Sequence, residues 1–199
     1  PEWFSAYLAT YVERDVRQIL NVSDLQAFQA FVRLCAGRVG QLVNLASLGS
    51  DCGITHNTAR AWLSVLEASY KVLRPPPWHA NLGKRLIKTP KLYLVDTGLL
   101  CALLGIRGAG QIAEHPLRGA IFENWVISEM QKARTNRGST AEFTFYRDQA
   151  GQEVDLVLDR GRENRSQFVF TTARGREMVF WQSARTSKQA RPSVRVPTA

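Results

Sequence analysis

The first residues of the chain carry apolar side chains at helical spacing. In residues 7–20, YLATYVERDVRQIL, apolar positions recur every three or four residues, which predicts a helix. Asn21 and Ser23–Asp24 indicate a stop followed by a new N-cap. The helix that follows would turn one face to the core, formed by Leu25, Phe28, Phe31, Val32 and Cys35. We therefore predict an N-terminal helical segment over residues 1–34.

The next stretch predicts two short helices separated by a glycine turn. Residues 42–48 are apolar at helical spacing, and the pattern breaks near Cys52–Gly53. Thr55 is a good N-cap for a helix over residues 56–69. This helix would bury Ala59, Trp62 or Leu63, and Leu66. This pattern is typical of a helix-turn-helix. The residues expected to face outward, and to contact DNA, are His56, Asn57, Arg60 and Ser64. Asn and Arg can read base edges, while Ser or His can reach phosphates.

Strand-like runs after the second helix predict a wing. They cover Tyr70–Arg74, residues 83–88 and residues 90–96, with Pro75–Pro77 and a loop between the first two. Basic side chains in this region make it a candidate for DNA contact: Lys71, Arg74, Lys84, Arg85, Lys88 and Lys91. Winged helices also act as docking or dimer modules, so DNA contact and partner docking both stay open. The predicted winged helix-turn-helix covers residues 35–106.

A second part of the chain follows a glycine-containing loop. Asp96 is expected to cap a short helix that Gly105 ends, and residues 107–116 are predicted as a loop between the parts. An amphipathic helix comes next, with a core face predicted to contain Phe122, Trp125, Val126 and Met130. Two strands close this part, Phe143–Arg147 and Glu153–Leu158. Gly151 marks a tight connection between them, which predicts a hairpin.

Two acids in this second part are candidate metal ligands and catalytic residues. Glu123 lies near the start of the helix, and Asp155 lies beside Glu153 on the second strand. A helix acid followed by a strand acid can hold Mg²⁺, which needs few carboxylates and keeps several waters. The alternative is structural. Glu123 would then be an acid favoured by the helix dipole, and Glu153 and Asp155 would lie on a solvated strand face.

The pattern changes at Arg160. Residues 160–199 are rich in Arg, Ser, Thr and Gln, and only residues 167–170 and 178–181 look strand-like. They carry +7 of the formal charge of +9. Residues 1–159 are therefore nearly neutral, and most of the positive charge lies in the tail. We expect residues 160–199 to be either a disordered tail or the product of a reading-frame change in a GC-rich gene. Reading the two alternative frames for a further strand would test the second idea.

Composition narrows the class of protein. A chain of 199 residues has room for one or two domains with a real core. Three cysteines without paired spacing indicate buried thiols in a cytoplasmic protein, since zinc would need more ligands nearby. The chain has no apolar run long enough for a membrane span and no signal segment. It begins with Pro1, which we interpret as a fragment boundary.

Several of these motifs in series resemble a known family. They are TYVERDVRQIL, WLSVLEASY in the helix-turn-helix, KTPKLYLVDTGLL, GAIFENWVISEM and FYRDQAGQEVDLVL, which span about residues 1–159. In this order they resemble the C-terminal half of bacterial and archaeal AAA+ ATPase-like proteins, the domain of unknown function 4143. The resemblance implies a nucleotide-binding domain elsewhere. This sequence contains no G-x-x-x-x-G-K-[ST] loop, so ATP binding by that route is not expected.

The last part of that family is similar to the PD-(D/E)xK nuclease fold. Carried over by motif, Glu123 matches the helix acid and Asp155 the strand acid. The acid-x-Lys motif would fall within residues 163–175, where Gln167 could replace the acid but Val169 takes the place of the lysine. Losing one such electrostatic group typically lowers the rate by about 10²–10³. The missing lysine therefore counts against catalysis.

These observations predict a helix-rich α+β fold. It consists of a winged helix-turn-helix followed by a truncated α/β nuclease-like piece over residues 117–159. The function we expect is a non-catalytic DNA- or partner-binding region of an AAA+ ATPase-like protein from a prokaryote. No cofactor is required for that function. One alternative is a metal-dependent nuclease using Glu123, Asp155 and Mg²⁺. The other is a pure interaction module, either toxin–antitoxin-like or docking onto a separate ATPase subunit.

Overall fold

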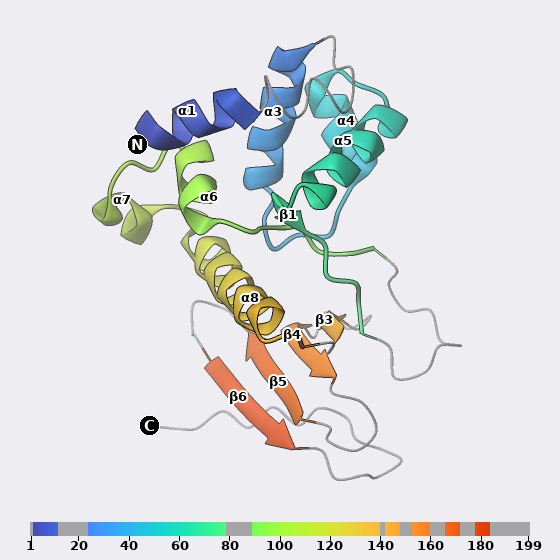
Figure 1. The fold of residues 1–199 in the computed structure, drawn as a ribbon, viewed down its shortest axis with the longest axis vertical. Coiled ribbons are helices and arrows are strands. Elements are labelled where there is room, and N and C mark those ends of the chain that lie inside the picture. Colours follow the sequence, from blue (N-terminus) through green and yellow to red (C-terminus); the bar gives the residue numbers. More distant parts are fainter. Residues whose placement is uncertain are drawn as a thin grey trace.

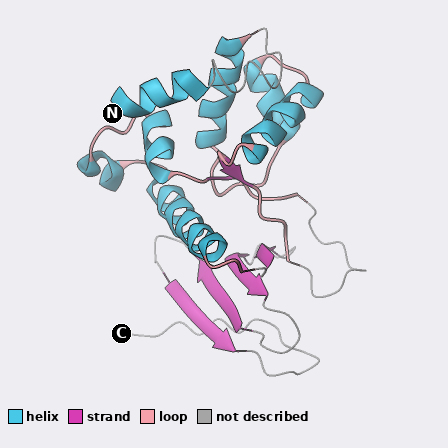
Figure 2. Cartoon of the chain, in the orientation of Figure 1, coloured by secondary structure: helices cyan, strands magenta, loops and turns pink. Residues whose placement is uncertain are grey.

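The computed structural model describes residues 2–11, 24–78, 89–139, 142–147, 153–159, 166–171 and 178–183. Helices gather at one end of the molecule and a four-stranded sheet lies at the other (Figures 1 and 2). The long helix α8, Arg118–Asn136, runs between them (Figure 1). The fold is thus helix-rich α+β, as predicted.

The other helices are short, and most begin at a capping side chain. They are α1 (Glu2–Thr10), α3 (Leu25–Ala36), α4 (Leu45–Cys52), α5 (His56–Ala68), α6 (Thr97–Leu103) and α7 (Ala109–Glu114). The side chains of Asp24, Thr55 and Asp96 each accept a hydrogen bond from the backbone N–H three residues later. All three caps were predicted, because a short polar side chain can satisfy a free N–H group of the first helical turn.

The first helices pack around aromatic side chains. Phe28 and Phe31 of α3 meet Trp62 of α5 edge to face, with ring centroids 5.2 and 5.5 Å apart. Ala59, Leu63 and Leu66 of α5 are fully buried beside them. The predicted inward face of this helix is therefore confirmed, as is the break at Gly53, which ends α4 in the left-handed conformation at φ 68°.

The segment after α3 departs from the sequence prediction. Leu42 and Val43 were expected in a helix, but Asn44 caps α4 and the helix begins only at Leu45. Leu42 instead forms an antiparallel bridge with Lys91, and the Val43 N–H donates to the carbonyl of Pro90. Strand pairing with a segment nearly 50 residues away, which local periodicity cannot reveal, has overridden the helical pattern.

A small antiparallel sheet lies below these helices. It pairs β1, Val72–Leu73, with β2, Tyr93–Leu94, within the predicted strand regions. Side chains alternate along the chain into β2: Leu92 and Leu94 join the helical cores, while Tyr93 joins a third cluster around α8. The segment is therefore buried on both faces, which places it between the helices and the larger sheet.

Helix α8 packs against the helical end on one side and against the large sheet on the other. Ile121 packs into the core of α6 and β2, while Ile127 packs with Phe143 and Leu156 of the large sheet. The predicted core face is wrong in one respect: Trp125 is 48% exposed, and the buried positions include polar residues, among them Glu123, Asn124 and Ser128. Because α8 is covered on two sides, a single apolar stripe does not describe it.

The large sheet has the order β3-β4-β5-β6, all antiparallel. Its strands are β3 (Glu142–Arg147), β4 (Glu153–Asp159), β5 (Ser166–Thr171) and β6 (Met178–Ser183). The predicted β3–β4 hairpin is confirmed. The expectation of a truncated sheet is not, because β5 and β6 from the tail extend it at the two places where the tail looked strand-like. At the other edge, Pro77 forms a parallel bridge with Phe145 of β3.

Two further expectations concern connections. Residues 107–116 were predicted as a loop, but they contain α7, whose start is stabilised when Gln111 Oε1 accepts hydrogen bonds from the Arg107 and Gly108 N–H groups. Residues 83–88, which were predicted as a strand, and residues 12–20, which were predicted as part of a helix, lie outside the described residues. Among the helices that the structure describes, none is long and apolar enough to cross a membrane.

Gly49 in α4 provides a test of the packing between α4 and α5. An alanine usually stabilises a helix interior relative to glycine by about 0.5–1 kcal/mol. A Cβ at Gly49 would lie only 2.8 Å from the Ile54 carbonyl oxygen, a backbone atom that cannot move aside easily. We expect Gly49→Ala to lower the free energy of unfolding by about 1–3 kcal/mol, measured by chemical denaturation. Gly119→Ala in α8 is the matched control, because its Cβ meets nothing within 4 Å. Equal effects of the two changes would contradict this packing.

Candidate functional site

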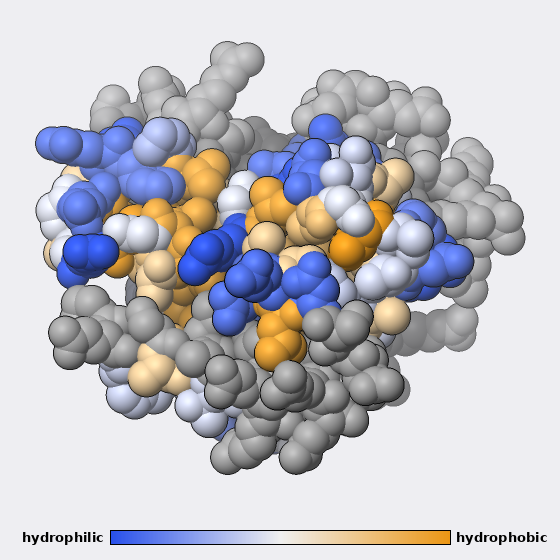
Figure 3. Space-filling view, turned by 90° about the horizontal axis from the view of Figure 1, so that it is seen from above, coloured by the Kyte–Doolittle hydropathy of each residue, from blue (hydrophilic) through white to orange (hydrophobic). Residues whose placement is uncertain are grey.

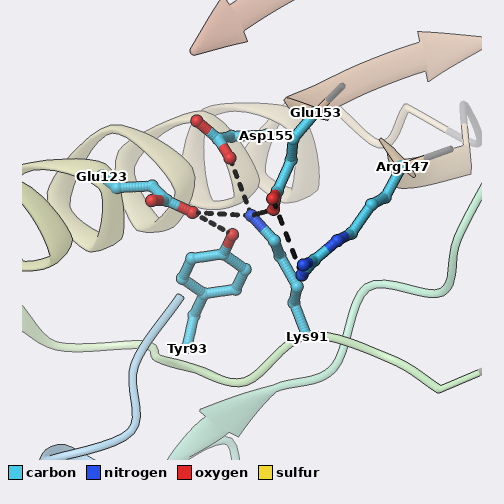
Figure 4. A network of polar contacts seen from close by, with 6 residues as sticks. All are labelled: Lys91, Tyr93, Glu123, Arg147, Glu153 and Asp155. Carbon is cyan, nitrogen blue, oxygen red and sulfur yellow. Dashed lines mark hydrogen bonds and ion pairs between the residues drawn. The ribbon is translucent and has the colours of Figure 1, made fainter. Parts of the chain in front are cut away.

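A buried lysine lies at the centre of the molecule. Lys91, two residues before the start of β2, is 1% exposed, and its ammonium group contacts three carboxylates (Figure 4). Nζ lies 2.7 Å from Oδ1 of Asp155 and 3.1 Å from Oε1 of Glu123, and it also pairs with Glu153. We call these four residues the Lys91 cluster. Lys91 was predicted as part of a basic wing surface, and this is wrong, because the acids hold its charge inside the protein.

The members of the Lys91 cluster come from three elements. Glu153 and Asp155 are two residues apart on β4, so their side chains leave the strand on the same side. Glu123 comes from α8 and is 6% exposed. It is the sixth residue of this helix, beyond the first turn, so the predicted contribution from the helix dipole is small. The expected solvated strand face is also wrong for Asp155, which is 5% exposed.

Three more side chains complete the surroundings. The Tyr93 hydroxyl donates to Oε1 of Glu123, the oxygen that also accepts from Lys91. The ring of Phe145 lies 5.6 Å from Lys91 Nζ, within the range of a cation–π contact. At the more open side, Nη1 of Arg147 lies 3.7 Å from Oε2 of Glu153. The Lys91 cluster is thus closed by polar and aromatic contacts on several sides.

Burial and charge change the protonation of these groups. Burial disfavours the charged ammonium of Lys91, but Glu123, Asp155 and Glu153 outweigh it and raise the lysine pKa above its usual value. Burial also raises the pKa of Glu123, and the nearby Asp155 carboxylate adds to this against the effect of Lys91. The pKa of Tyr93 is well above its usual value, first through burial and then through the Glu123 charge, so Tyr93 acts as a neutral donor.

Backbone packing brings the helical end of the molecule up to the same acid. Gly40 has a φ of 75°, and a Cβ there would lie 3.3 Å from Oε2 and 3.4 Å from Oε1 of Glu123. Its N–H donates to the Leu92 carbonyl, and the Leu92 N–H donates to the Gln41 carbonyl. A glycine is therefore required for both the backbone conformation and the close approach to Glu123.

Asn124, the neighbour of Glu123, fixes α8 to β2. Its side-chain Oδ1 accepts from the Leu94 N–H at 2.7 Å, and Nδ2 donates to the Leu94 carbonyl at 3.1 Å. Nδ2 also lies 3.2 Å from Oγ1 of Thr97. Pairing of β2 with β1 leaves the N–H and carbonyl of Leu94 without a strand partner. The Asn124 side chain satisfies both groups. The register between α8 and β2, and hence the position of Glu123, follows from this contact.

The acids predicted as metal ligands do meet, but they meet around a lysine. Glu123 Oε1 and Asp155 Oδ1 both accept from Lys91, which holds the space between them. Within the described parts of the chain, no group of three or more His, Cys, Asp or Glu side chains is arranged to hold a metal ion. In this arrangement the residues present do not fit a divalent metal bound between Glu123 and Asp155.

The predicted DNA-contact residues of α5 form a separate surface. Each is exposed, and none makes a side-chain hydrogen bond or ion pair with another described residue: His56, Asn57, Arg60 and Ser64. Asn57, Arg60 and Ser64 come one, four and eight residues after His56, so the four side chains lie close together on one side of the helix. We call these four residues the α5 face. The prediction that they point outward is confirmed.

Other predicted DNA-contact residues have partners inside the protein. Lys71 contacts the Tyr7 hydroxyl and lies over the rings of Tyr7 and Tyr11 at 4.9 and 4.8 Å. Arg74 pairs with Glu67 of α5. Both side chains are half-buried, so these contacts compete with any contact to phosphate. Lys84, Arg85 and Lys88 lie outside the described residues.

The three cysteines are free thiols, as expected. Cys35 is buried, and burial raises its pKa to about 12, while Cys52 and Cys101 are half-buried and their pKa values are also raised by burial. A raised pKa keeps a thiol protonated and unreactive at neutral pH. These residues pack with their apolar neighbours and do not extend either candidate site.

Sequence reasoning missed Lys91, Tyr93 and Asn124 as site residues. One signal was present: in KLYLV the polar and aromatic residues alternate with leucines, which is the period of a strand with two different faces. The partner acids lie 32 to 64 residues away, so no local pattern identifies them. Lysine is also among the residues least often buried, which made an exposed wing the natural prediction.

Removal of the Asn124 amide tests how α8 is fixed to β2. In Asn124→Ala, the buried N–H and carbonyl of Leu94 lose their partner, at a cost of about 1–3 kcal/mol for each group. We expect a clear fall in the midpoint of urea unfolding. Asn136→Ala, at the exposed end of the same helix, should change the free energy of unfolding by no more than about 0.5 kcal/mol. A loss in Asn124→Ala no larger than in this control would rule out the proposed anchoring.

Comparison with known proteins assigns two adjoining regions. Residues 118–168 match the Domain of unknown function (DUF4143), whereas residues 1–109 match a different family, the Domain of unknown function (DUF8612). The predicted resemblance to DUF4143 is thus confirmed for residues 118–168, and its expected extent over residues 1–159 is corrected. The matched region also continues past Asp159 into β5, so the beginning of the tail belongs to it.

Two curated relatives are uncharacterized proteins of Mycobacterium bovis and Mycobacterium tuberculosis. Each is 32% identical over 158 residues, which cover 79% of this chain but only 35% of the relative. The chain therefore spans about a third of the length of these proteins. No solved structure matches it. Because the DUF8612 match over residues 1–109 covers more than half of the sequence, this chain belongs to the family of the Domain of unknown function (DUF8612), and a DUF4143 region follows at residues 118–168.

Proposed function

We propose that this chain is a DNA-binding region without chemistry of its own. The observation that carries the proposal is the α5 face, in which His56, Asn57, Arg60 and Ser64 are exposed together. These side chains offer the donors and acceptors that proteins use for base edges and phosphates. Their shared side of α5 is also free of side-chain pairing to other described residues, so binding DNA breaks no contact there.

The elements around α5 support a winged helix-turn-helix. Helix α4 leads through Gly53 into α5, which Thr55 caps. Residues 40–43, β1 and β2 pair into a small sheet beside these helices, in the order expected for a winged helix. In such modules the second helix of the turn enters the major groove and its N-terminal residues contact bases. His56, Asn57 and Arg60 lie in the first part of α5.

The surface of the helical end is compatible with a polar partner. Seen from that end, hydrophilic and hydrophobic areas lie side by side across the described surface (Figure 3). The largest exposed apolar side chains of the described residues are Trp3, Tyr70 and Trp125, and each belongs to a different element or loop. A partner protein remains the competing explanation, because docking modules use the same fold and can use these aromatic residues.

A nuclease has less support. A nuclease of the kind expected would need Glu123 and Asp155 open to a metal and a phosphodiester. Both carboxylates instead pair with Lys91, whose ammonium also lies over the ring of Phe145, and Gly40 lies close to Glu123. We therefore propose a non-catalytic role. The connection to an AAA+ ATPase-like protein rests on the family resemblance and on relatives almost three times as long as the matched region.

The proposal predicts that DNA affinity depends on the α5 face. We expect Arg60→Ala and Asn57→Ala each to weaken binding to duplex DNA by about tenfold, since one good base contact contributes about 1–3 kcal/mol. Fluorescence anisotropy with the full chain would measure this, at several salt concentrations because phosphate contacts make affinity salt-dependent. Arg137→Ala is the matched control, because Arg137 is an exposed arginine at the C-terminal end of α8.

The basic tail requires its own comparison. Residues 160–199 carry a net charge of +7 and would bind DNA non-specifically whatever α5 does. If Arg60→Ala, Asn57→Ala and Arg137→Ala all bind like the unchanged protein, the affinity comes from elsewhere and the proposal fails. Mg²⁺-dependent nicking of DNA that disappears in Glu123→Ala would instead favour the nuclease.

A further inference from the structure

We infer that the Lys91 ammonium is the resident cation of the acid cluster, and that this protein holds no divalent metal between Glu123 and Asp155. The nuclease-like part of the family implies a metal at these two acids. In this chain a positive charge carried by the protein itself takes that place. The inference is independent of DNA binding by α5.

The contacts of Lys91 are those of a bound cation. Its Nζ is 2.7 Å from Asp155 Oδ1 and 3.1 Å from Glu123 Oε1, and Glu153 supplies another oxygen. The side chains of Lys91, Glu123 and Asp155 are only 2%, 8% and 6% exposed. An ammonium group has three N–H donors, and three carboxylates match that number. The pairing therefore satisfies the lysine fully.

A divalent ion has no room beside this lysine. Mg²⁺ binds oxygen at about 2.0–2.1 Å and keeps several waters in an octahedron. The carboxylate oxygens it would need are those that accept from Nζ, and the aromatic ring of Phe145 borders the same space. Two positive centres sharing these oxygens would also repel each other strongly at low dielectric. A metal could enter only if Lys91 left.

The backbone opposes such a departure. Lys91 forms a bridge with Leu42, and the residues on both sides of it are also paired, since Pro90 accepts from Val43 and Leu92 exchanges hydrogen bonds with residues 40 and 41. Moving the Lys91 backbone would break several of these bonds. The side chain is also held in place, because the carboxylates that it neutralises enclose it. Lys91 is therefore a permanent counter-ion and does not act as a gate.

Electrostatics explain why a lysine suits this position. Two buried carboxylates, Glu123 and Asp155, beside the half-buried Glu153 would be strongly destabilising without a cation, since removing one partner of a buried ion pair leaves an uncompensated charge. A metal can dissociate or be removed by a chelator, whereas a lysine is part of the chain. The structure of this region should therefore not depend on the concentration of free metal.

The test is a titration of the full chain with Mn²⁺, followed by the relaxation of water protons, together with thermal melting. For the unchanged protein we expect no Mn²⁺ to bind at Asp155, so Asp155→Asn should not change the titration. We also expect the same Tm in EDTA as in about 10 mM Mg²⁺, a concentration roughly a hundred times the dissociation constant of the site being tested. Saturating such a site would raise Tm by about 5–10 °C. Binding of one Mn²⁺ that is lost in Asp155→Asn would overturn the inference.

A lysine variant sharpens the result. In Lys91→Ala the carboxylates keep their positions on α8 and β4 but lose their cation, so we expect a lower Tm and a partial recovery of Tm with Mn²⁺. The double variant Lys91→Ala/Asp155→Asn should show no recovery. If Lys91→Ala does not fold, the titration of the unchanged protein still decides the question. If Lys91→Ala melts like the unchanged protein in EDTA, the ammonium is not the required cation and the inference fails.

Discussion

The fold depends on one buried charge and its three acids. Lys91 comes from the strand region below the helices, Glu123 from α8, and Glu153 and Asp155 from the large sheet, so one ammonium group joins three layers. A buried cation stabilises a fold only where its partners are positioned well enough to repay its desolvation. Asn124 and Gly40 provide that positioning, since one fixes α8 against β2 and the other lets the backbone approach Glu123.

This arrangement links the two family regions into one structure. The boundary between the matched regions falls near residues 110–117, yet Lys91 and Tyr93 on one side contact Glu123 on the other. Lys91 and Asp155 are 64 residues apart in sequence. Contacts between residues so far apart in sequence slow folding, because the entropy of loop closure is lost before they form. The boundary between the two matched families is thus crossed by buried contacts of one side-chain cluster.

Local features could be predicted from the sequence, and long-range ones could not. The caps at Asp24, Thr55 and Asp96, the inward face of α5 and the β3–β4 hairpin follow from short-range rules of capping and periodicity. Glu123 and Asp155 were identified through the family motifs, but their partner was not. Leu42 and Lys91 were misplaced for a common reason, since their conformations depend on pairing with each other across the fold.

The proline segment beside β3 has a consequence for how the sheet ends. Phe145 of β3 donates to the Pro76 carbonyl and accepts from the Trp78 N–H, so residues 76–78 run along the outer side of this strand. Pro75, Pro76 and Pro77 have no N–H groups, and therefore they cannot donate to a further strand. An exposed strand edge invites pairing between molecules. At β3 the chain ends its own sheet with residues unable to continue it, which protects this edge from aggregation.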